Sequence, residues 1–484
     1  MRELPFRSGR APVLQFIGIF LLIFLLGPGC KKSASQPEDN ASAILWLSDP
    51  GQNIQFTEQA SGVWTGKRNG FVDINVDPAS RYQEIDGFGF ALTGGSALHI
   101  HNMSAAARRN LLTELFDHTG NNVGVSYIRI SIGASDLDEY VFSYDDLPAG
   151  QTDVTMAQFS LDEDRRYLIP VLKEILQINP DLKILGSPWS APVWMKTNGS
   201  SIGGSLKAEY DDAYALYFVK YIQGMAAEGI TIDAITVQNE PLHGGNNPSM
   251  VMQADAQADF IKNSLGPAFQ NAGIQSKIIV YDHNADRPDY PIAILNDPDA
   301  RQYVDGSAFH LYGGDISALS SVHTAHPDKN LYFTEQWIGA PGNFAEDLKW
   351  HIRELVIGAT RNWSRNVIEW NLAADENQDP HTPGGCDRCL GALTISGDMV
   401  ARNPAYYIIA HAAKFVRPGS QRIHSSTTAD LPNVAFQTPD GRIVLIVLNN
   451  SNADILFNVL VEDKAIYSSL AAGAVGTYVW EAGL

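Results

Sequence analysis

Cysteine is scarce in this sequence. The chain has three cysteines among 484 residues, too few for the disulfide framework of a small secreted scaffold. Cys386 and Cys389 form one isolated Cys-x-x-Cys, with His381 as the only histidine nearby. Three candidate ligands fall short of a closed structural zinc site, so we expect no metal there. A local disulfide between Cys386 and Cys389, formed in an oxidising compartment, is the favoured interpretation.

Positive charge is also in short supply. Lys and Arg total 34 against 54 Asp and Glu, which gives a formal net charge of -20. Such a chain is poorly suited to nucleic acid or to an anionic membrane surface. We therefore predict no nucleic-acid partner. The charge suits a neutral partner such as a glycan, and it equally serves solubility alone.

Long apolar runs are confined to the N-terminal region. Several arginines precede an apolar stretch from about Val13 to Leu26, which is too short to span a bilayer comfortably. Small residues and Cys30 follow, as in an export signal. A Cys directly after Gly resembles the end of a bacterial lipoprotein signal, although Gly27 stands where such signals usually carry Leu.

These features predict the topology of the N-terminal region. We expect a signal over residues 1–30, lipid attachment at Cys30 and a flexible polar tether over residues 31–42. Simple signal cleavage is the alternative. The chain is then a cell-surface or periplasmic lipoprotein, or otherwise a secreted protein. It contacts a membrane only through this N-terminal lipid anchor.

A Gly-rich nucleotide-binding loop is missing after the first predicted strand, because Gly87-Phe-Gly-Phe lacks the required spacing. This disfavours an open doubly wound sheet, which remains the alternative fold. Short β-branched or aromatic runs instead alternate with longer amphipathic stretches. Eight such units predict an α/β fold, a (β/α)8 TIM barrel. The predicted strands begin at Ile85, Tyr127, Lys183, Ala234, Lys277, Gly306, Asn330 and Asn366.

Helical patterns separate these strands. The clearest cover Ser104–His118, Asp211–Glu228, Ala254–Ala272 and Phe344–Thr360. From about residue 421 strands follow one another without helices, and the stretch from Ala43 to Val76 is also strand-like. We therefore predict a catalytic barrel over residues 81–420. Residues 43–80 and 421–484 would together form a side β-sandwich.

Polar and aromatic residues gather at the carboxyl ends of the predicted strands, where such barrels place catalytic groups. Carboxylates, amides and indoles suit a sugar, since aromatic rings stack on its apolar face and polar groups bind its hydroxyls. The residues are Asp136, Trp189, Asn239, Glu240, Asp282, His283, Asn284, His310, Tyr312, Glu335, Trp370 and Asn371.

Glu240 and Glu335 follow the fourth and seventh predicted strands, on opposite sides of a barrel mouth. A retaining glycosidase needs two carboxyl groups about 5–5.5 Å apart, one as nucleophile and one as acid/base. A single Glu at a strand end is often a structural ion pair, but two facing each other favour this chemistry. The acid is expected to have the higher pKa of the two.

Several segments resemble glycoside hydrolase family 30, which includes glucosylceramidases and β-1,6-glucanases. The resemblance runs from about residue 83 to the C-terminus, and its most specific part is Gly186-Ser-Pro-Trp-Ser-Ala-Pro-Val-Trp-Met-Lys-Thr-Asn-Gly. The triplet Asn-Glu-Pro alone is shared by many related barrel glycosidases. Other matching segments are Gln83-Glu-Ile-Asp-Gly-Phe-Gly, Ile128-Arg-Ile-Ser-Ile-Gly, Val237-Gln-Asn-Glu-Pro, Phe309-His-Leu-Tyr, Leu331-Tyr-Phe-Thr-Glu-Gln, Glu369-Trp-Asn-Leu-Ala and Lys414-Phe-Val-Arg-Pro-Gly-Ser.

The resemblance implies roles for individual residues. Glu240 falls on the family's acid/base and Glu335 on its nucleophile. The sugar-binding positions fall on Asp136, Trp189, Asn239, Tyr312 and Trp370, and the supporting positions on Arg129 and His310. No cofactor is implied.

Each of these roles has a plainer alternative. Both tryptophans could be core residues, and Asp136 could cap a loop. Arg129 is better explained as a structural partner that keeps the nucleophile ionised than as a sugar ligand. Asp282 and His283 match no family role and are interpreted as loop residues.

The substrate is predicted from one loop. Gly384-Gly-Cys-Asp-Arg-Cys-Leu-Gly looks like the eighth-strand loop of the β-1,6-glucanase branch. We therefore expect β-1,6-glucan, with glucosylceramide or another β-glucoside as the alternative and xylan, fucoside or galactan behind them. A non-catalytic carbohydrate-binding surface protein is an alternative of another class. A metal-dependent hydrolase is disfavoured, because His99-Ile-His101 has no third ligand nearby and Pro241 interrupts the Glu240–His243 spacing.

Overall fold

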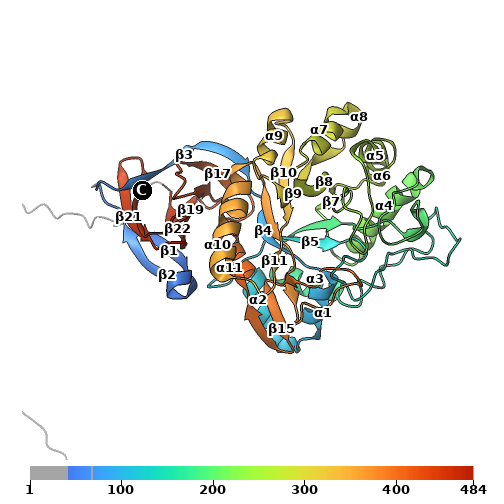
Figure 1. Ribbon diagram of the computed structural model, residues 1–484, viewed down its shortest axis with the longest axis horizontal. Helices are drawn as coiled ribbons and strands as arrows, with labels where there is room; N and C mark the ends of the chain where they lie inside the picture. Colours follow the sequence, from blue (N-terminus) through green and yellow to red (C-terminus); the bar gives the residue numbers. More distant parts are fainter. Residues whose placement is uncertain (1–41, 67–68, 483–484) are drawn as a thin grey trace, which may run out of the picture. The chain divides into compact units, whose positions relative to one another are not determined.

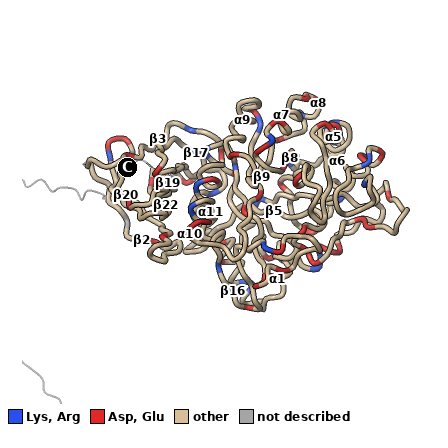
Figure 2. The backbone as a smooth tube through the Cα atoms, in the orientation of Figure 1, with Lys and Arg blue, Asp and Glu red and all other residues tan. Residues whose placement is uncertain are grey.

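The computed structural model describes residues 42–66 and 69–482. The predicted signal, Cys30 and most of the predicted tether lie outside the described residues. Among the described residues, none of the helices combines the length and apolar character needed to cross a bilayer. Acidic and basic positions are interspersed along the described backbone (Figure 2).

The central sheet has eight strands, each hydrogen-bonded in parallel to its neighbour in the order β10-β9-β8-β7-β6-β5-β4-β12 (Figure 1). An isolated parallel bridge between Leu331 and Ser364 brings the two edges together, so the sheet is a nearly closed barrel. The predicted TIM barrel is confirmed, and the doubly wound alternative is wrong. The strands are β4 (Gly87–Ala91), β5 (Tyr127–Ser131), β6 (Lys183–Ser187), β7 (Ala234–Thr236), β8 (Lys277–Ala285), β9 (Val304–Gly314), β10 (Asn330–Glu335) and β12 (Asn366–Glu369).

Helices connect the barrel strands. Ser104 caps the second helix, as its hydroxyl accepts a hydrogen bond from the amide of Ala107. The helices are α1 (Gly94–Asn102), α2 (Ala105–Phe116), α3 (Leu168–Ile178), α4 (Asp211–Ala227), α5 (Ala254–Phe260), α6 (Gly266–Ala272), α7 (Asp289–Asn296), α8 (Pro298–Arg301), α9 (Ala318–Ala325), α10 (Phe344–His351) and α11 (Pro404–Ala413). Short 3-10 helices are η1 (Pro50–Gln52), η2 (Val193–Met195) and η3 (Ala208–Tyr210).

Two predicted helices are not regular along their whole length. A π-helical segment, η4 (Ile261–Leu265), divides the predicted Ala254–Ala272 helix, and η5 (Ile352–Ala359) forms the second half of the Phe344–Thr360 helix. Pro267 lacks the N–H that would bond the carbonyl four residues earlier, and the helix widens just before it. The spacing of apolar residues in the sequence does not show where an α-helix changes to a π-helix.

Both ends of the described chain contribute to a nine-stranded sheet, in the order β2-β1-β22-β19-β18-β17-β3-β20-β21. β1 pairs antiparallel with β22, which joins the first described strand to the last. The sheet forms the β-sandwich. Its strands are β1 (Ser42–Asp49), β2 (Ile54–Val63), β3 (Val72–Glu84), β17 (Gln421–Ser425), β18 (Asn433–Gln437), β19 (Arg442–Leu448), β20 (Ile455–Val461), β21 (Lys464–Leu470) and β22 (Val475–Glu481).

Short strands pair in the loops that follow the carboxyl ends of the barrel strands. β11 (Ile338–Gly339) pairs with β14 (Cys389–Leu390), so the loops after β10 and β12 are tied together. β15 (Leu393–Ser396) lies between β13 (Ala373–Ala374) and β16 (Met399–Arg402).

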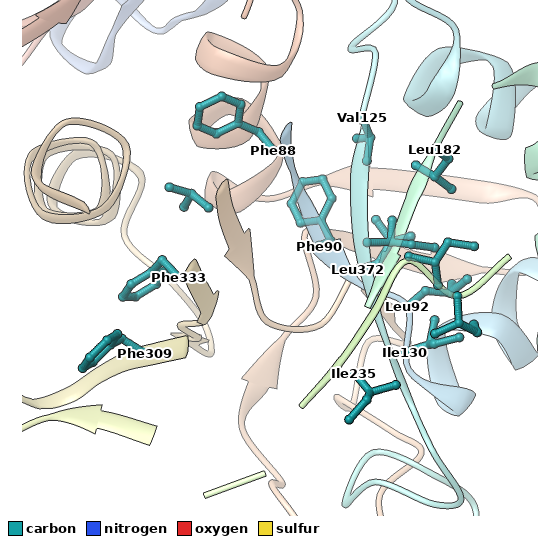
Figure 3. Close-up of a cluster of buried hydrophobic side chains, with 14 of the residues drawn as sticks. Phe88, Phe90, Leu92, Val125, Ile130, Leu182, Ile235, Phe309, Phe333 and Leu372 are labelled. Atoms are coloured by element: carbon teal, nitrogen blue, oxygen red, sulfur yellow. The ribbon is translucent and has the colours of Figure 1, made fainter. Parts of the chain in front are cut away.

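The barrel core is built from the apolar residues of its strands. Figure 3 shows Phe88 and Phe90 from β4 with Phe309 from β9 and Phe333 from β10 in this core. All four are fully shielded from solvent. Gly89 separates the first two because a Cβ at that position would lie 1.9 Å from the carbonyl oxygen of Tyr127 on β5. These residues pack in the apolar core around the barrel strands.

A buried histidine connects barrel and sandwich. His411 in α11 bonds through Nδ1 to the hydroxyl of Thr477 and through Nε2 to the hydroxyl of Ser48, each at 2.8 Å. Burial lowers the pKa of His411 to about 3. The ring is therefore neutral, with one nitrogen donating and the other accepting.

Candidate active site

The carboxyl ends of the barrel strands surround a cavity of about 300 Å³. β6, β7, β9, β10 and β12 each place at least one lining side chain at or just beyond its end. This is the end at which TIM barrels carry their active sites. The lining residues are Asp136, Trp189, Glu240, His243, Asn246, His283, Asn284, Tyr312, Glu335, Trp337, Trp370, Cys386 and Cys389.

Glu240 and Glu335 face each other in this cavity. A carboxylate oxygen of each lies within 4.8 Å of the other, and both side chains are nearly buried. Glu335 is the last residue of β10. Glu240 follows β7 with a φ of 44°, a left-handed conformation that a glutamate adopts at an energetic cost and that is typical of functional sites. Two carboxyl groups at this separation fit the retaining arrangement.

Arg129 is a buried cation of the site. Its guanidinium donates to Glu335 at 2.5 Å, to Asn239 at 2.6 Å and to Ser187 at 3.1 Å, and it is fully shielded from solvent. Burial alone would lower the pKa of Arg129, but the neighbouring carboxylates raise it above its ordinary value. The arginine therefore stays charged and holds one oxygen of Glu335 in place.

Asp282 corrects the sequence interpretation. It lies in β8, as does His283, so neither is a loop residue, and the Asp282 side chain is fully buried. A register shift between β8 and β9 occurs at this residue, whose φ is 67°, and the bulge turns its side chain toward the other strands. Its carboxylate accepts from five side chains: Arg129 at 2.7 Å, Ser187 at 2.6 Å, Thr236 at 2.7 Å, Thr334 at 2.6 Å and His310 at 3.1 Å.

These partners explain the charge of Asp282. Burial would raise the pKa of its carboxyl, but the charge of Arg129 and the hydrogen bonds hold it well below its usual range. In the sequence, Asp282 comes directly after the apolar run of the predicted strand that begins at Lys277. Its partners come from five other strands, and no pattern in the neighbouring sequence predicts them.

His310 joins Asp282 to Glu240. Its Nε2 lies 3.1 Å from Asp282, and its Nδ1 lies 3.4 Å from Glu240 and 3.8 Å from Glu335. Burial would lower the pKa of His310, but the surrounding carboxylates raise it to about 9. His283 lies 3.8 Å from Glu240, and burial lowers its pKa to about 4.

Two opposing effects set the pKa of Glu240 in the free site. Burial raises the pKa of Glu240, but the hydrogen bond from His310 and its positive charge outweigh burial and leave the pKa below its ordinary value. That the acid has the higher pKa of the two carboxyl groups stays a prediction. His310 and Glu240 are in contact and therefore titrate as a pair.

The residues that the family resemblance assigns to sugar binding differ in what they contact. Trp189 and Trp370 line the cavity with ring centroids 5.3 Å apart, and the guanidinium of Arg129 lies over both rings. Tyr312 donates its hydroxyl to Glu335 at 2.8 Å. Asn239 directs its amide oxygen to Arg129. Among the residues that the structure describes, it is not one of those that line the cavity.

Asp136 reaches the cavity from the loop after β5. Burial and the charge of Glu335 raise the pKa of its carboxyl to about 7, while a hydrogen bond from the amide of Cys386 acts in the opposite sense. Cys386 and Cys389 form a disulfide on the same wall of the cavity.

Glu240, His310 and Glu335 are close enough together to hold a metal ion. Their charges argue against it. Glu335 already forms an ion pair with Arg129, and His310 carries a proton, so positive charge stands beside the position a cation would take. The arrangement suits acid, base and nucleophile chemistry on a neutral substrate.

Sequence profiles identify the family. The profile of the glycosyl hydrolase family 30 TIM-barrel domain matches residues 85–416, and that of the family 30 β-sandwich domain matches residues 419–478. The chain belongs to glycoside hydrolase family 30. Family 30 members are retaining hydrolases, and this protein is accordingly a retaining glycosidase.

Family 30 proteins of known activity are similar over most of the chain. An endo-1,6-β-D-glucanase of Neurospora crassa is 34% identical, with 93% of this chain and 96% of the relative covered. The lysosomal acid glucosylceramidase of Mus musculus is 29% identical, with 84% and 83% covered. A solved endo-β1,6-glucanase structure is 35% identical, with a TM-score of 0.85 and with 91% of this chain and 99% of that chain covered.

Proposed function

We propose that this family 30 enzyme hydrolyses β-1,6-glucan by double displacement, with Glu335 as nucleophile and Glu240 as acid/base. The observation that carries the proposal is the short separation of the two carboxylates, within 4.8 Å, at the mouth of the barrel. That spacing leaves room for attack on the anomeric carbon but not for an intervening water, as retention requires.

Glu335 is suited to attack. Arg129 holds its Oε2 and Tyr312 donates to its Oε1, so both oxygens have a fixed donor. A carboxylate fixed in this way meets the anomeric carbon with little reorganisation. In the first step Glu335 bonds that carbon, and the bond to the leaving oxygen breaks.

Glu240 supplies the proton to the leaving oxygen. In the free site this proton rests on His310, whose Nδ1 lies 3.4 Å from Glu240. Passage of the proton to Glu240 leaves a neutral His310 that still donates its Nε2–H to Asp282. After glycosylation Glu240 is ionised and takes a proton from water, whose oxygen attacks the anomeric carbon and releases Glu335.

The remaining residues bind the sugar. Trp189 and Trp370 form an apolar wall beside the two carboxylates, and the carboxyl of Asp136 offers an acceptor for hydroxyl groups. Asn239 accepts a hydrogen bond from Arg129, and His310 contacts Glu240. A hydrogen bond from such a group to the sugar 2-hydroxyl strengthens in the transition state.

The glucan preference is supported by relatives. Three curated endo-1,6-β-D-glucanases are 32–34% identical and are covered over at least 93% of their length. The glucosylceramidases are 27–32% identical and are covered over 79–83%. Glucosylceramide is therefore the second candidate.

The test is a side-by-side product analysis on β-1,6-glucan, β-1,3-glucan and glucosylceramide. We expect oligosaccharides or glucose from β-1,6-glucan at a rate at least about tenfold above the rates on the other two substrates. A few gained or lost contacts in a binding pocket separate the rates on related substrates by about this factor. Faster release of ceramide would reverse the assignment.

We also propose that the enzyme is exported and held at a membrane by lipid on Cys30. The basic, apolar and small-residue succession before Cys30 supports this, and the polar residues after it form a spacer. Cys30→Ser should move active enzyme into the soluble fraction with unchanged turnover of soluble glucan. An unmodified N-terminus beyond Cys30 in the wild type would leave simple secretion instead.

A further inference from the structure

The loop after β12 returns over the cavity and carries the Cys386–Cys389 disulfide. Cys389 packs in one buried cluster with Trp189 and Trp370, and Cys386 borders the same cluster. The disulfide is therefore part of the wall that faces the two carboxylates. The proposed mechanism gives it no role.

This loop contacts Asp136 at three points. The amide of Cys386 donates to the Asp136 carboxylate at 3.3 Å, and the amide of Thr382 donates to the Asp136 carbonyl at 2.9 Å. A Cβ on Gly385 would lie 2.4 Å from that carbonyl, so the loop backbone packs directly against Asp136. The position of the Asp136 side chain thus depends on the position of the loop.

The other end of the loop is fixed to the barrel. Cys389 lies in β14, which pairs with β11, and its carbonyl accepts from the Asn371 side chain at 3.1 Å. On the opposite side the Asn247 side chain donates to the carbonyl of Pro383 at 3.0 Å. Cys386 stands between these anchors. The disulfide joins it to the strand-paired Cys389.

We propose that the Cys386–Cys389 disulfide positions the carboxylate of Asp136 for a sugar hydroxyl. The inference rests on the proposed function, because it takes Asp136 as a sugar-binding group. By fixing Cys386 to Cys389, the disulfide keeps the Cys386 amide aimed at Asp136. That hydrogen bond also favours the charged carboxylate against burial and against the negative charges of Glu335 and Glu240.

A double-mutant cycle tests this coupling. Cys386→Ser/Cys389→Ser removes the disulfide, and Asp136→Asn removes the group that it positions. The readouts are kcat and KM on an aryl β-glucoside and the Kd of a glucose-type iminosugar. Asp387→Asn is the matched control, because Asp387 lies between the cysteines and is exposed.

In an otherwise wild-type chain the two serines should weaken iminosugar binding and lower kcat/KM by about tenfold, as expected for a misplaced charge-assisted hydrogen bond. In the Asp136→Asn chain the same substitutions should cost less than about twofold, because their target is gone. The control should match wild type. Reduction of the folded wild-type enzyme should reproduce the serine effect and reoxidation should reverse it, which covers a double variant that does not fold.

An equal loss in both backgrounds would overturn the inference, since the disulfide would then act on the whole loop and not through Asp136. Unchanged constants after removal or reduction of the disulfide would overturn it as well. Either result leaves the proposed function intact if wild type cleaves β-1,6-glucan. Failure of wild type to cleave any β-glucoside would instead contradict the proposed function, and the inference with it.

Discussion

Arg129 and Asp282 form an ion pair with an N–O distance of 2.7 Å in which neither side chain is exposed to solvent. The pair connects the two proposed catalytic residues, because Arg129 also binds Glu335 and Asp282 also binds His310, the neighbour of Glu240. A single buried carboxylate thus orients both halves of the site.

Replacing Asp282 tests this relationship. Asp282→Ala leaves Arg129 without one buried partner and should destabilise the fold by about 3–5 kcal/mol. Activity should also fall by at least about 100-fold, because Glu335 and His310 lose their fixed positions. Chemical denaturation and kcat measurements check both.

Asp282→Asn is the matched control for that experiment. It keeps the shape and can still accept hydrogen bonds, but it removes the charge. We expect a loss of activity close to that of Asp282→Ala with a smaller loss of stability. Wild-type activity in the Asn variant would show that the charge of Asp282 is dispensable.

The hydroxyl of Tyr312 should matter for the chemical step. Tyr312→Phe removes the donor 2.8 Å from Glu335 and leaves the ring in place. Loss of a hydrogen bond to a charged group predicts a fall in kcat of about tenfold or more, with a smaller change in KM. A change confined to KM would mean that Tyr312 acts on the sugar alone.

Glu240→Ala should depend on the leaving group. Natural glucan has a basic leaving oxygen that needs a proton, whereas dinitrophenolate does not. We expect at least about a 100-fold loss on glucan and a much smaller loss in the first step on a dinitrophenyl glucoside. Equal losses on the two substrates would count against the acid/base role.

Acid stability should depend on His411. Its pKa is about 3 in the folded protein against an ordinary value of 6.5, so the unfolded chain binds the extra proton between these values. The stability that the neutral ring provides is present above about pH 6.5 and is lost as pH falls toward 3.

His411→Gln should remove that pH dependence. The loss in wild type amounts at most to about 5 kcal/mol by pH 3 and to about 3 kcal/mol by pH 4. The variant should lack this component of the decline while being less stable at neutral pH. Thermal unfolding of both proteins from pH 7 to pH 4 checks this. Parallel curves for the two proteins would contradict it.

The barrel could be predicted because its strands are short apolar runs separated by helical periods. All eight expected runs overlap barrel strands in the structure. Glu240, Glu335, Trp189 and Trp370 could also be located, since each follows such a run. Their position at the strand ends is a property of the fold and needs no knowledge of distant contacts.

Asp282 could not be assigned for a physical reason. Its orientation depends on a bulge in β8 and its charge on five partners spread along the chain. The raised pKa of His310 could not be predicted for the same reason, because it depends on three carboxylates that meet only in the folded barrel. The loop contacts of Asp136 likewise join residues about 250 positions apart.

Trapping the covalent intermediate tests the central claim most directly. A 2-deoxy-2-fluoro-β-glucosyl donor with a good leaving group slows both steps of a retaining enzyme and lets the glycosyl-enzyme accumulate. Peptide mass spectrometry of the labelled wild-type protein should find the sugar on Glu335. Glu335→Ala should take up no label, and azide should partly restore its activity on an activated substrate. Label on any other carboxylate would contradict the account.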